Sequence, residues 1–139
     1  MIGELLINGK DAYTNFGVSI GEGFLDALRG PAPLKDFTES KSRLEHGKQV
    51  IISNPKLDER DLTLTFTLEG SNESDFNSKR QAFYSELYKG AIDIKIPVIG
   101  SEVYHLIYTG KNISYAQNAA RTFTKMSMKF NEPNPYNRL

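Results

Sequence analysis

The sequence predicts an α+β fold that is mainly β: an antiparallel β-sandwich or open barrel flanked by one α-helix at about residues 74–89. Three observations lead to this prediction. Apolar and polar residues alternate strictly between residues 61 and 69, apolar residues then take helical spacing, and alternation returns after Gly90. A period of two indicates strands with one buried face, and a period near 3.6 indicates a helix that covers such a face.

The central strand and helix have the clearest patterns. Apolar residues fill every second position of the strand: Leu62, Leu64, Phe66 and Leu68. Threonines lie between them, so one face is apolar and the other polar. In the helix, Phe76, Phe83 and Leu87 fall on one stripe, and Gly90 marks its end.

The N-terminal part has weaker strand signals. An apolar run at residues 5–7 meets the turn signal Asn8-Gly9, and a second run follows at 16–20, which predicts a strand pair. Residues 21–49 are rich in glycine, proline and mixed charge, so we expect a long loop with one helical turn at 24–28. Loops of this length are uncommon in compact domains and are often functional.

The remaining strands are predicted from alternation or from β-branched and aromatic residues: 50–52, 92–96, 103–109, 113–117 and 122–130. Only three turn-forming residues separate 103–109 from 113–117. We therefore expect these two strands to form a hairpin.

Composition narrows the class of protein. The 139 residues are most simply one domain, 1–139, and 17 basic side chains balance 17 acidic ones. A net charge of zero argues against long-range attraction to nucleic acid or to an anionic membrane. The absence of cysteine excludes disulfides and thiolate metal sites. Neither a signal-peptide pattern nor an apolar run of roughly 20 residues occurs, so we expect a soluble product without a classical export signal.

The chemical motifs are weak. Gly17-Val18-Ser19-Ile20-Gly21 matches the G-x-S-x-G pattern of a hydrolase, but a nucleophile elbow needs a strand before the serine and a helix directly after it. His46 lies in the charged loop and His105 within a strand, without metal-site spacing. We therefore expect no enzyme, no cofactor and no metal. A monomeric ligand-binding sandwich, with Tyr104, Tyr108 and Tyr115 contacting a sugar or peptide, is the alternative.

The order of the elements resembles a known family. The segments that carry the resemblance are Ile7-Asn8-Gly9-Lys10, Phe16-Gly17-Val18, the long loop, the strand at 61–70, the helix with Lys79, Phe83 and Leu87, the strand at 92–96, the tyrosine-rich strand at 103–108, and the ending Lys129-Phe130-Asn131-Glu132-Pro133. This arrangement is similar to the N-terminal domain of siphophage distal tail proteins and to the tail-tube fold shared with type VI secretion tube proteins. The resemblance covers nearly the whole chain.

The resemblance implies a structural protein of the virion tail, assembled in the bacterial cytoplasm. Its subunits would pair into a ring, expected to be a hexamer, around a channel through which DNA or a tape-measure protein passes as cargo. Other tail proteins are the expected partners, and a membrane is not. Many distal tail proteins continue into a second, carbohydrate-binding-like domain, whereas this sequence stops at Leu139, so we expect a ring or adaptor role rather than host binding.

Loop length and sheet-edge character point to two contact regions, the loop at 30–48 and the segment 103–117. The residues expected to contact neighbouring subunits or partners are Arg43, His46, Tyr104, Ile107 and Tyr108.

Overall fold

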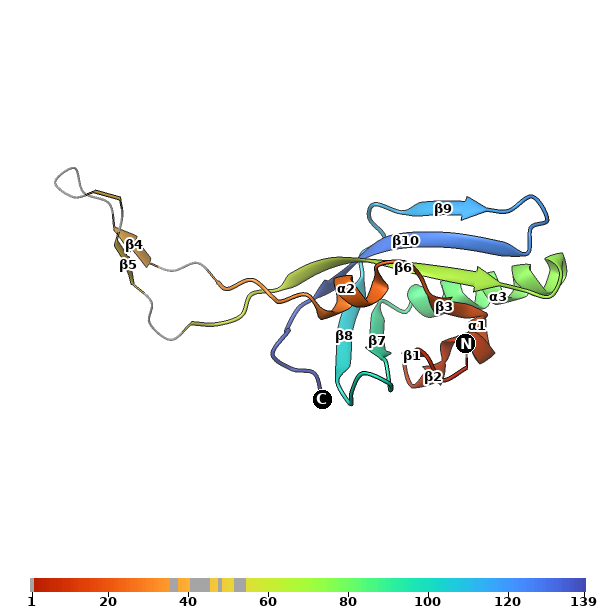
Figure 1. Cartoon of the computed structure of the whole chain (residues 1–139), viewed down its shortest axis with the longest axis horizontal. Coiled ribbons are helices and arrows are strands. Elements are labelled where there is room, and N and C mark those ends of the chain that lie inside the picture. Colours follow the sequence, from red (N-terminus) through yellow and green to blue (C-terminus); the bar gives the residue numbers. More distant parts are fainter. Residues whose placement is uncertain (1, 36–37, 41–45, 48, 52–54) are drawn as a thin grey trace.

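The computed structural model describes residues 2–35, 38–40, 46–47, 49–51 and 55–139, and shows a curled antiparallel half-barrel with helices against it (Figure 1). The main sheet contains β1 (Leu6–Ile7), β2 (Lys10–Asp11), β3 (Val18–Ile20), β6 (Arg60–Glu69), β7 (Ala91–Lys95), β8 (Val103–Tyr108), β9 (Ser114–Gln117) and β10 (Phe123–Glu132). Their order is β2-β1-β7-β8-β10-β6-β3, and β9 also pairs with β10. The predicted mainly-β α+β class is confirmed, with an open barrel rather than a sandwich.

The longest ladder joins β6 to β10. It runs without interruption from Arg60 opposite Glu132 to Glu69 opposite Phe123. Alternate residues of both strands are buried: Leu62, Leu64, Phe66, Leu68, Met126, Met128 and Phe130. The predicted alternation is therefore correct, and it directs one face of both strands into the core.

Helix α3 (Glu73–Leu87) covers this apolar face. The Asn72 side chain caps the helix by accepting a hydrogen bond of 2.8 Å from the Asp75 N–H. The ring of Phe83 packs edge-on against Phe66 with 5.4 Å between the centroids, and Phe66 also contacts Phe130 at 6.1 Å. The predicted helix is confirmed, and two short helices accompany it: α1 (Ala12–Phe16) and α2 (Phe24–Arg29).

The N-terminal pairing differs from the prediction. The Asn8-Gly9 turn joins β1 to β2, and the run at 16–20 does not pair with β1. Gly17 ends α1 at φ 67°, where an added Cβ would meet the main-chain oxygen of Glu69 at 2.4 Å. Only glycine allows the chain to pass this close to Glu69. This close passage places β3 beside β6.

The segment expected to be a long loop at 21–49 contains regular structure. The helical turn predicted at 24–28 is confirmed as α2. Beyond it the chain leaves the body as an arm, in which β4 (Thr38–Ser40) pairs with β5 (Gln49–Ile51) (Figure 1). A bridge between Leu34 and Leu57 joins the two sides of the arm at its base.

The hairpin predicted for 103–117 is wrong. Strands β8 and β9 both lie along the same edge of β10, with Tyr108 opposite Phe130 and Ser114 opposite Ser127. Residues 109–113 therefore bulge outward opposite only residues 128–129. Gly110 and Asn112 adopt φ of 68° and 51° in this bulge, so the turn signal is real although the chain does not reverse.

We expect Phe66→Ala to lower the free energy of unfolding by about 3–5 kcal/mol, because it leaves a cavity among three aromatic rings. Urea denaturation measures this change. Thr63→Ala, on the exposed face of the same strand, is the matched control and should stay within about 0.5 kcal/mol of the parent. Equal losses for the two variants would contradict the assignment of the buried face.

Candidate assembly surfaces

Strand β9 presents an unpaired edge. A bond of 3.0 Å from the Asn118 N–H to the Phe123 oxygen sets the phase of the β9–β10 ladder. Because antiparallel residues point alternately toward and away from their partner strand, the main-chain groups of Tyr115 and Gln117 point away from β10. All four residues of β9 are exposed. The edge therefore offers free donors and acceptors to another strand.

Tyrosines gather between α3 and the β8–β9 side of the sheet. The Tyr88 ring lies 6.2 Å from that of Tyr84 and 6.1 Å from that of Tyr108, and the Arg80 guanidinium lies 5.5 Å from the Tyr84 ring. Burial raises the pKa of Tyr84 and Tyr108 above the ordinary value of a phenol. Tyr88 remains 70% exposed, so the cluster presents an aromatic surface to solvent.

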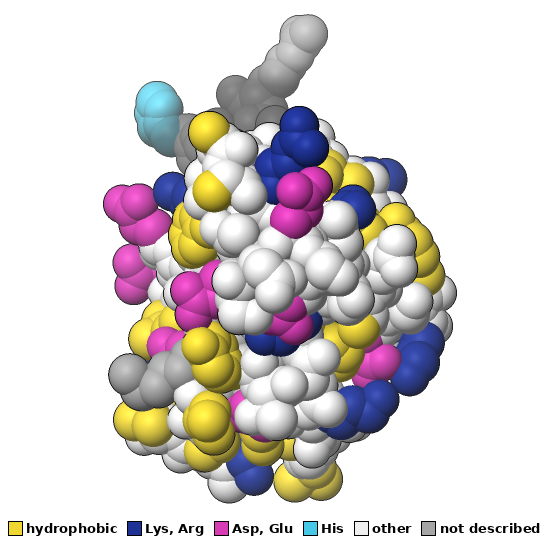
Figure 2. All heavy atoms as spheres, turned by 90° about the vertical axis from the view of Figure 1, so that its right-hand side faces the viewer, with side chains coloured by type: hydrophobic (Ala, Val, Ile, Leu, Met, Phe, Trp, Pro, Cys, Tyr) yellow, Lys and Arg dark blue, Asp and Glu magenta, His cyan; other side chains and the backbone are white. Residues whose placement is uncertain are grey.

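The terminal strand β3 borders an apolar hollow. This hollow has a volume of about 300 Å³ and is lined by Ile2, Gly3, Glu4, Ile20, Leu25, Ile96, Val98 and Ile99. Ile2 and Val98 are 71% and 85% exposed. On the face that Figure 2 draws, several exposed apolar groups lie among side chains of both charges. Exposed aliphatic groups beside a sheet edge are typical of surfaces that another chain covers.

A buried ion-pair cluster holds the base of the arm. Arg60, 5% exposed, places Nη2 2.8 Å from Oε1 of Glu132, and Arg138 Nε lies 3.1 Å from Oε2 of the same carboxylate. Arg60 Nη1 also donates to the Gly30 oxygen at 2.7 Å, which fixes the end of α2. The Arg138 guanidinium stacks over Tyr104 at 4.6 Å. The arm, β10 and the C-terminal segment therefore meet at Glu132.

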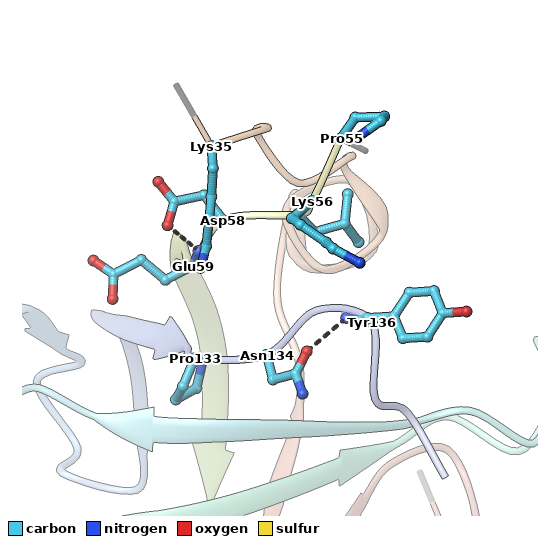
Figure 3. Close-up of a pocket in the computed structure, with 9 residues that line it drawn as sticks. Lys35, Pro55, Lys56, Asp58, Glu59, Pro133, Asn134 and Tyr136 are labelled. Carbon is cyan, nitrogen blue, oxygen red and sulfur yellow. Dashed lines mark hydrogen bonds between the residues drawn. The ribbon is translucent and has the colours of Figure 1, made fainter. Parts of the chain in front are cut away.

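Past this cluster the chain segments on either side of the ladder diverge and leave a cleft. The cleft has a volume of about 1160 Å³ and is lined by residues of the arm base and of 133–136. Figure 3 shows Asp58 and Glu59 on one side and Lys56 and Tyr136 on the other. Its walls carry both signs of charge, so they indicate no particular class of ligand.

The sheet face opposite α3 is polar. It carries the threonines of β6 together with Lys125, Ser127 and Lys129 of β10, all outside the core. Lys125 lies 3.5 Å from Glu22 and Lys129 lies 3.7 Å from Asp61, so carboxylates accompany these lysines. The face is therefore hydrophilic, and it has no strong excess of positive or negative charge.

The predicted contact residues lie in different places. Arg43 lies outside the described residues, and His46 is exposed on the arm. Ile107 is 46% exposed, Tyr108 is partly buried, and Tyr104 is 4% exposed in the core. Their role in contacts remains a prediction, and the buried position of Tyr104 makes it the least suited to contact a partner.

The aromatic patch proposed for a ligand is assembled differently from the prediction. Tyr104 is buried under Arg138, whereas Tyr84 and Tyr88 join Tyr108. Spacing of four residues on a helix could have identified the first two as neighbours. No sequence signal indicated that Arg60 and Glu132 would be paired, because 72 residues separate them in the chain and only the register of the ladder places them opposite each other.

The residues that match the G-x-S-x-G pattern do not form the strand–turn–helix arrangement of a hydrolase nucleophile elbow. Ser19 lies within β3 opposite Thr67, and residues 21–23 separate the strand from α2. The His105 ring contacts Asp93 and the main-chain oxygen of Leu139. Within the described part of the chain, no group of three metal-ligating side chains occurs and no helix is long and apolar enough to cross a bilayer.

These features define a class of protein: a curled β-sheet protein with one long helix, a projecting arm and sheet edges with unpaired main-chain groups. The fold is similar to that of a solved phage protein. SPP1 Dit (gp 19.1), described as a paradigm of the hub adsorption apparatus in phages that infect Gram-positive bacteria, matches over 95% of this chain with a TM-score of 0.63 and 15% sequence identity. The match covers 50% of the Dit chain, so this chain spans about half of its length. No protein-family model and no curated protein matches the sequence.

We expect Glu132→Gln to lower the free energy of unfolding by about 3–5 kcal/mol, because the neutral amide leaves the buried Arg60 cation without a counter-charge. Urea denaturation measures this change in the free energy of unfolding. Glu102→Gln removes another carboxylate near Arg138, but this one is 58% exposed and 3.5 Å away, so the change should stay below about 1 kcal/mol. Similar values for both variants would contradict a special role for Glu132.

Proposed function

We propose that this chain is a structural protein of a phage or prophage tail, which forms or caps a ring at the junction between the tail tube and the baseplate. The observation that carries this proposal is the likeness of the fold, over 95% of the chain, to a phage hub protein. The proposed role requires no catalytic site and no cofactor. It places the protein in the virion tail, after assembly in the bacterial cytoplasm.

Two separate surfaces of the sheet support ring formation. The β9 edge has free main-chain groups at Tyr115 and Gln117, and the β3 end has an apolar hollow beside Ile20. Because these surfaces differ, a contact between them is head-to-tail, and repetition of such a contact closes into a ring when the rotation between subunits permits. A hexamer is the ring size that the family resemblance implies.

The polar sheet face suits the wall of a channel. Its threonines and its lysines with nearby carboxylates are hydrophilic but nearly balanced in charge. A balanced wall does not bind DNA tightly, since affinity for the phosphate backbone grows with the number of unneutralised cations. DNA or a tape-measure protein therefore passes as cargo and is not retained.

The arm is the proposed contact with neighbouring subunits or other tail proteins. It projects from the body in Figure 1, and His46, which lies between β4 and β5 in the chain, is exposed. A projecting two-stranded segment is marginally stable alone and gains stability when another surface covers it.

A monomeric ligand-binding module is the second candidate function. The tyrosine cluster of Tyr84, Tyr88 and Tyr108 favours it, because exposed aromatic rings stack on sugars or peptides. Light scattering across a concentration series separates the two candidates. A strict monomer that binds a ligand saturably would support the module, and a defined ring would support the tail protein.

We expect Tyr115→Pro to raise the protein concentration needed for ring formation by about tenfold or more. The reason is that proline removes an N–H that points away from β10 and is available to a neighbour. Light scattering measures the assembly midpoint. Tyr115→Ala keeps the N–H and removes the same ring, so it is the matched control. If both variants assemble equally, strand addition at β9 is excluded as the contact.

We expect Ile107→Asp to weaken assembly while lowering the free energy of unfolding by only about 1–2 kcal/mol, since Ile107 is 46% exposed but lies within a strand. The double change Arg43→Ala with His46→Ala tests the arm in the same way. Analytical ultracentrifugation gives the mass and a thermal melt gives the stability. Unchanged assembly in both variants would remove these residues from the contact surface.

A further inference from the structure

The first half of β8 has an edge that β10 does not cover. The ladder between β8 and β10 includes only Tyr108 and Ile107. The bond from the Tyr108 N–H to the Gly90 oxygen sets the phase of β8 against β7, so the main-chain groups of Val103 and His105 point away from β7. This exposed edge is separate from the β9 edge.

The C-terminal residues cover that edge at one end. We call residues 137–139 the clasp. The Val103 N–H donates to the Arg138 oxygen at 3.0 Å, and His105 Nε2 lies 2.9 Å from the Leu139 oxygen. Between the clasp and the β8–β10 ladder is a hollow of about 200 Å³ beside Leu106 and Ile107. The clasp therefore closes over the edge without pairing along its whole length.

His105 has an acceptor at each ring nitrogen. Nδ1 lies 2.9 Å from Oδ1 of Asp93, and Nε2 faces the Leu139 oxygen. A neutral imidazole has one N–H and one lone pair, so it can donate to only one of these oxygens. The imidazolium has two N–H groups and donates to both. The closed clasp therefore favours the protonated ring.

We propose that the clasp is a pH-sensitive latch, controlled by His105, that uncovers the edge of β8 when the ring loses its proton. In the closed form the protonated ring holds Leu139 and the Val103 N–H holds Arg138. Above the pKa of His105 one ring nitrogen presents a lone pair to an oxygen, and the clasp opens more often. The freed main-chain groups of Val103 and His105 form an edge of the kind that accepts a polypeptide strand.

The groups around His105 favour its protonated form in the closed clasp. The pKa of His105 is raised, first by the hydrogen bond to Asp93 on β7, then by the Leu139 oxygen and the charges of Asp93 and Glu132, while partial burial lowers it. Arg138 is the cation on the clasp itself, and Glu132 and Glu102 hold it at 3.1 and 3.5 Å. Lys95 is a cation on β7 and lies opposite Val103. Since the pKa is raised in the closed form, latch stability is full below the ordinary pKa of roughly 6.5 and is lost as pH rises through the raised value.

The test is amide exchange of Val103 by NMR between pH 5 and 9, expressed as a protection factor so that the intrinsic pH dependence is removed. Protection should fall about tenfold for each unit by which closing raises the pKa of His105. The amide of Met128, in the central ladder, reports global stability in the same sample. A Val103 protection factor that stays constant while His105 titrates would overturn the latch.

Two variants identify the responsible group. His105→Gln removes the titration, so Val103 protection should become independent of pH. Asp93→Asn keeps an acceptor but removes the charge, so the step should move to lower pH. A step that persists unchanged in His105→Gln would assign the pH dependence elsewhere and overturn the proposal. The latch does not depend on ring formation, so monomeric Tyr115→Pro protein should show the same step.

Discussion

The buried pairing of Arg60 with Glu132 is the interaction on which the arrangement of this chain depends. It lies at the last rung of the β6–β10 ladder, where both side chains are buried. A buried cation is tolerated only with a counter-charge and hydrogen bonds, so this end of the ladder must form as one unit. Because Arg60 also holds the end of α2 and Glu132 also holds Arg138, the arm and the C-terminal segment emerge from a fixed point.

The aromatic core has the complementary role. Phe66 packs edge-on with Phe24, Phe83 and Phe130, and this joins α2, α3, β6 and β10 around one ring. Such contacts are directional as well as apolar, so they determine how the helices lie on the sheet. A body held in this way can leave its sheet edges unpaired and still remain folded. Open edges are a hazard for a monomer and a means of assembly for a subunit.

The sequence identified the parts of the fold in which the pattern is local. Alternation in residues 61–69 and the helical stripe with Phe83 were sufficient to predict the central strand and the helix. Burial of one face imposes a regular spacing of apolar residues, and this spacing is visible within a short segment. Pairing was less predictable. Residues 103–109 and 113–117 contain hairpin signals, yet both strands pair with β10, since a long partner strand satisfies more main-chain groups than a short hairpin does. The spacing within one segment also did not reveal which side chains reach the surface. Ile107 is exposed, whereas Tyr104 is buried and Tyr84 and Tyr88 lie beside Tyr108.

The sequence alone determined the mainly-β class, the position of α3, the polar and apolar faces of the central strands, and the balance of charge, because each of these depends on composition or on spacing within one element. Only the tertiary structure decided which edges remain open, that Arg60 would meet Glu132, and that His105 would lie between Asp93 and Leu139. These contacts join residues far apart in the chain, and the geometry of the curled sheet brings them together. The register between strands is a property of the whole sheet, and no single segment of the sequence specifies it.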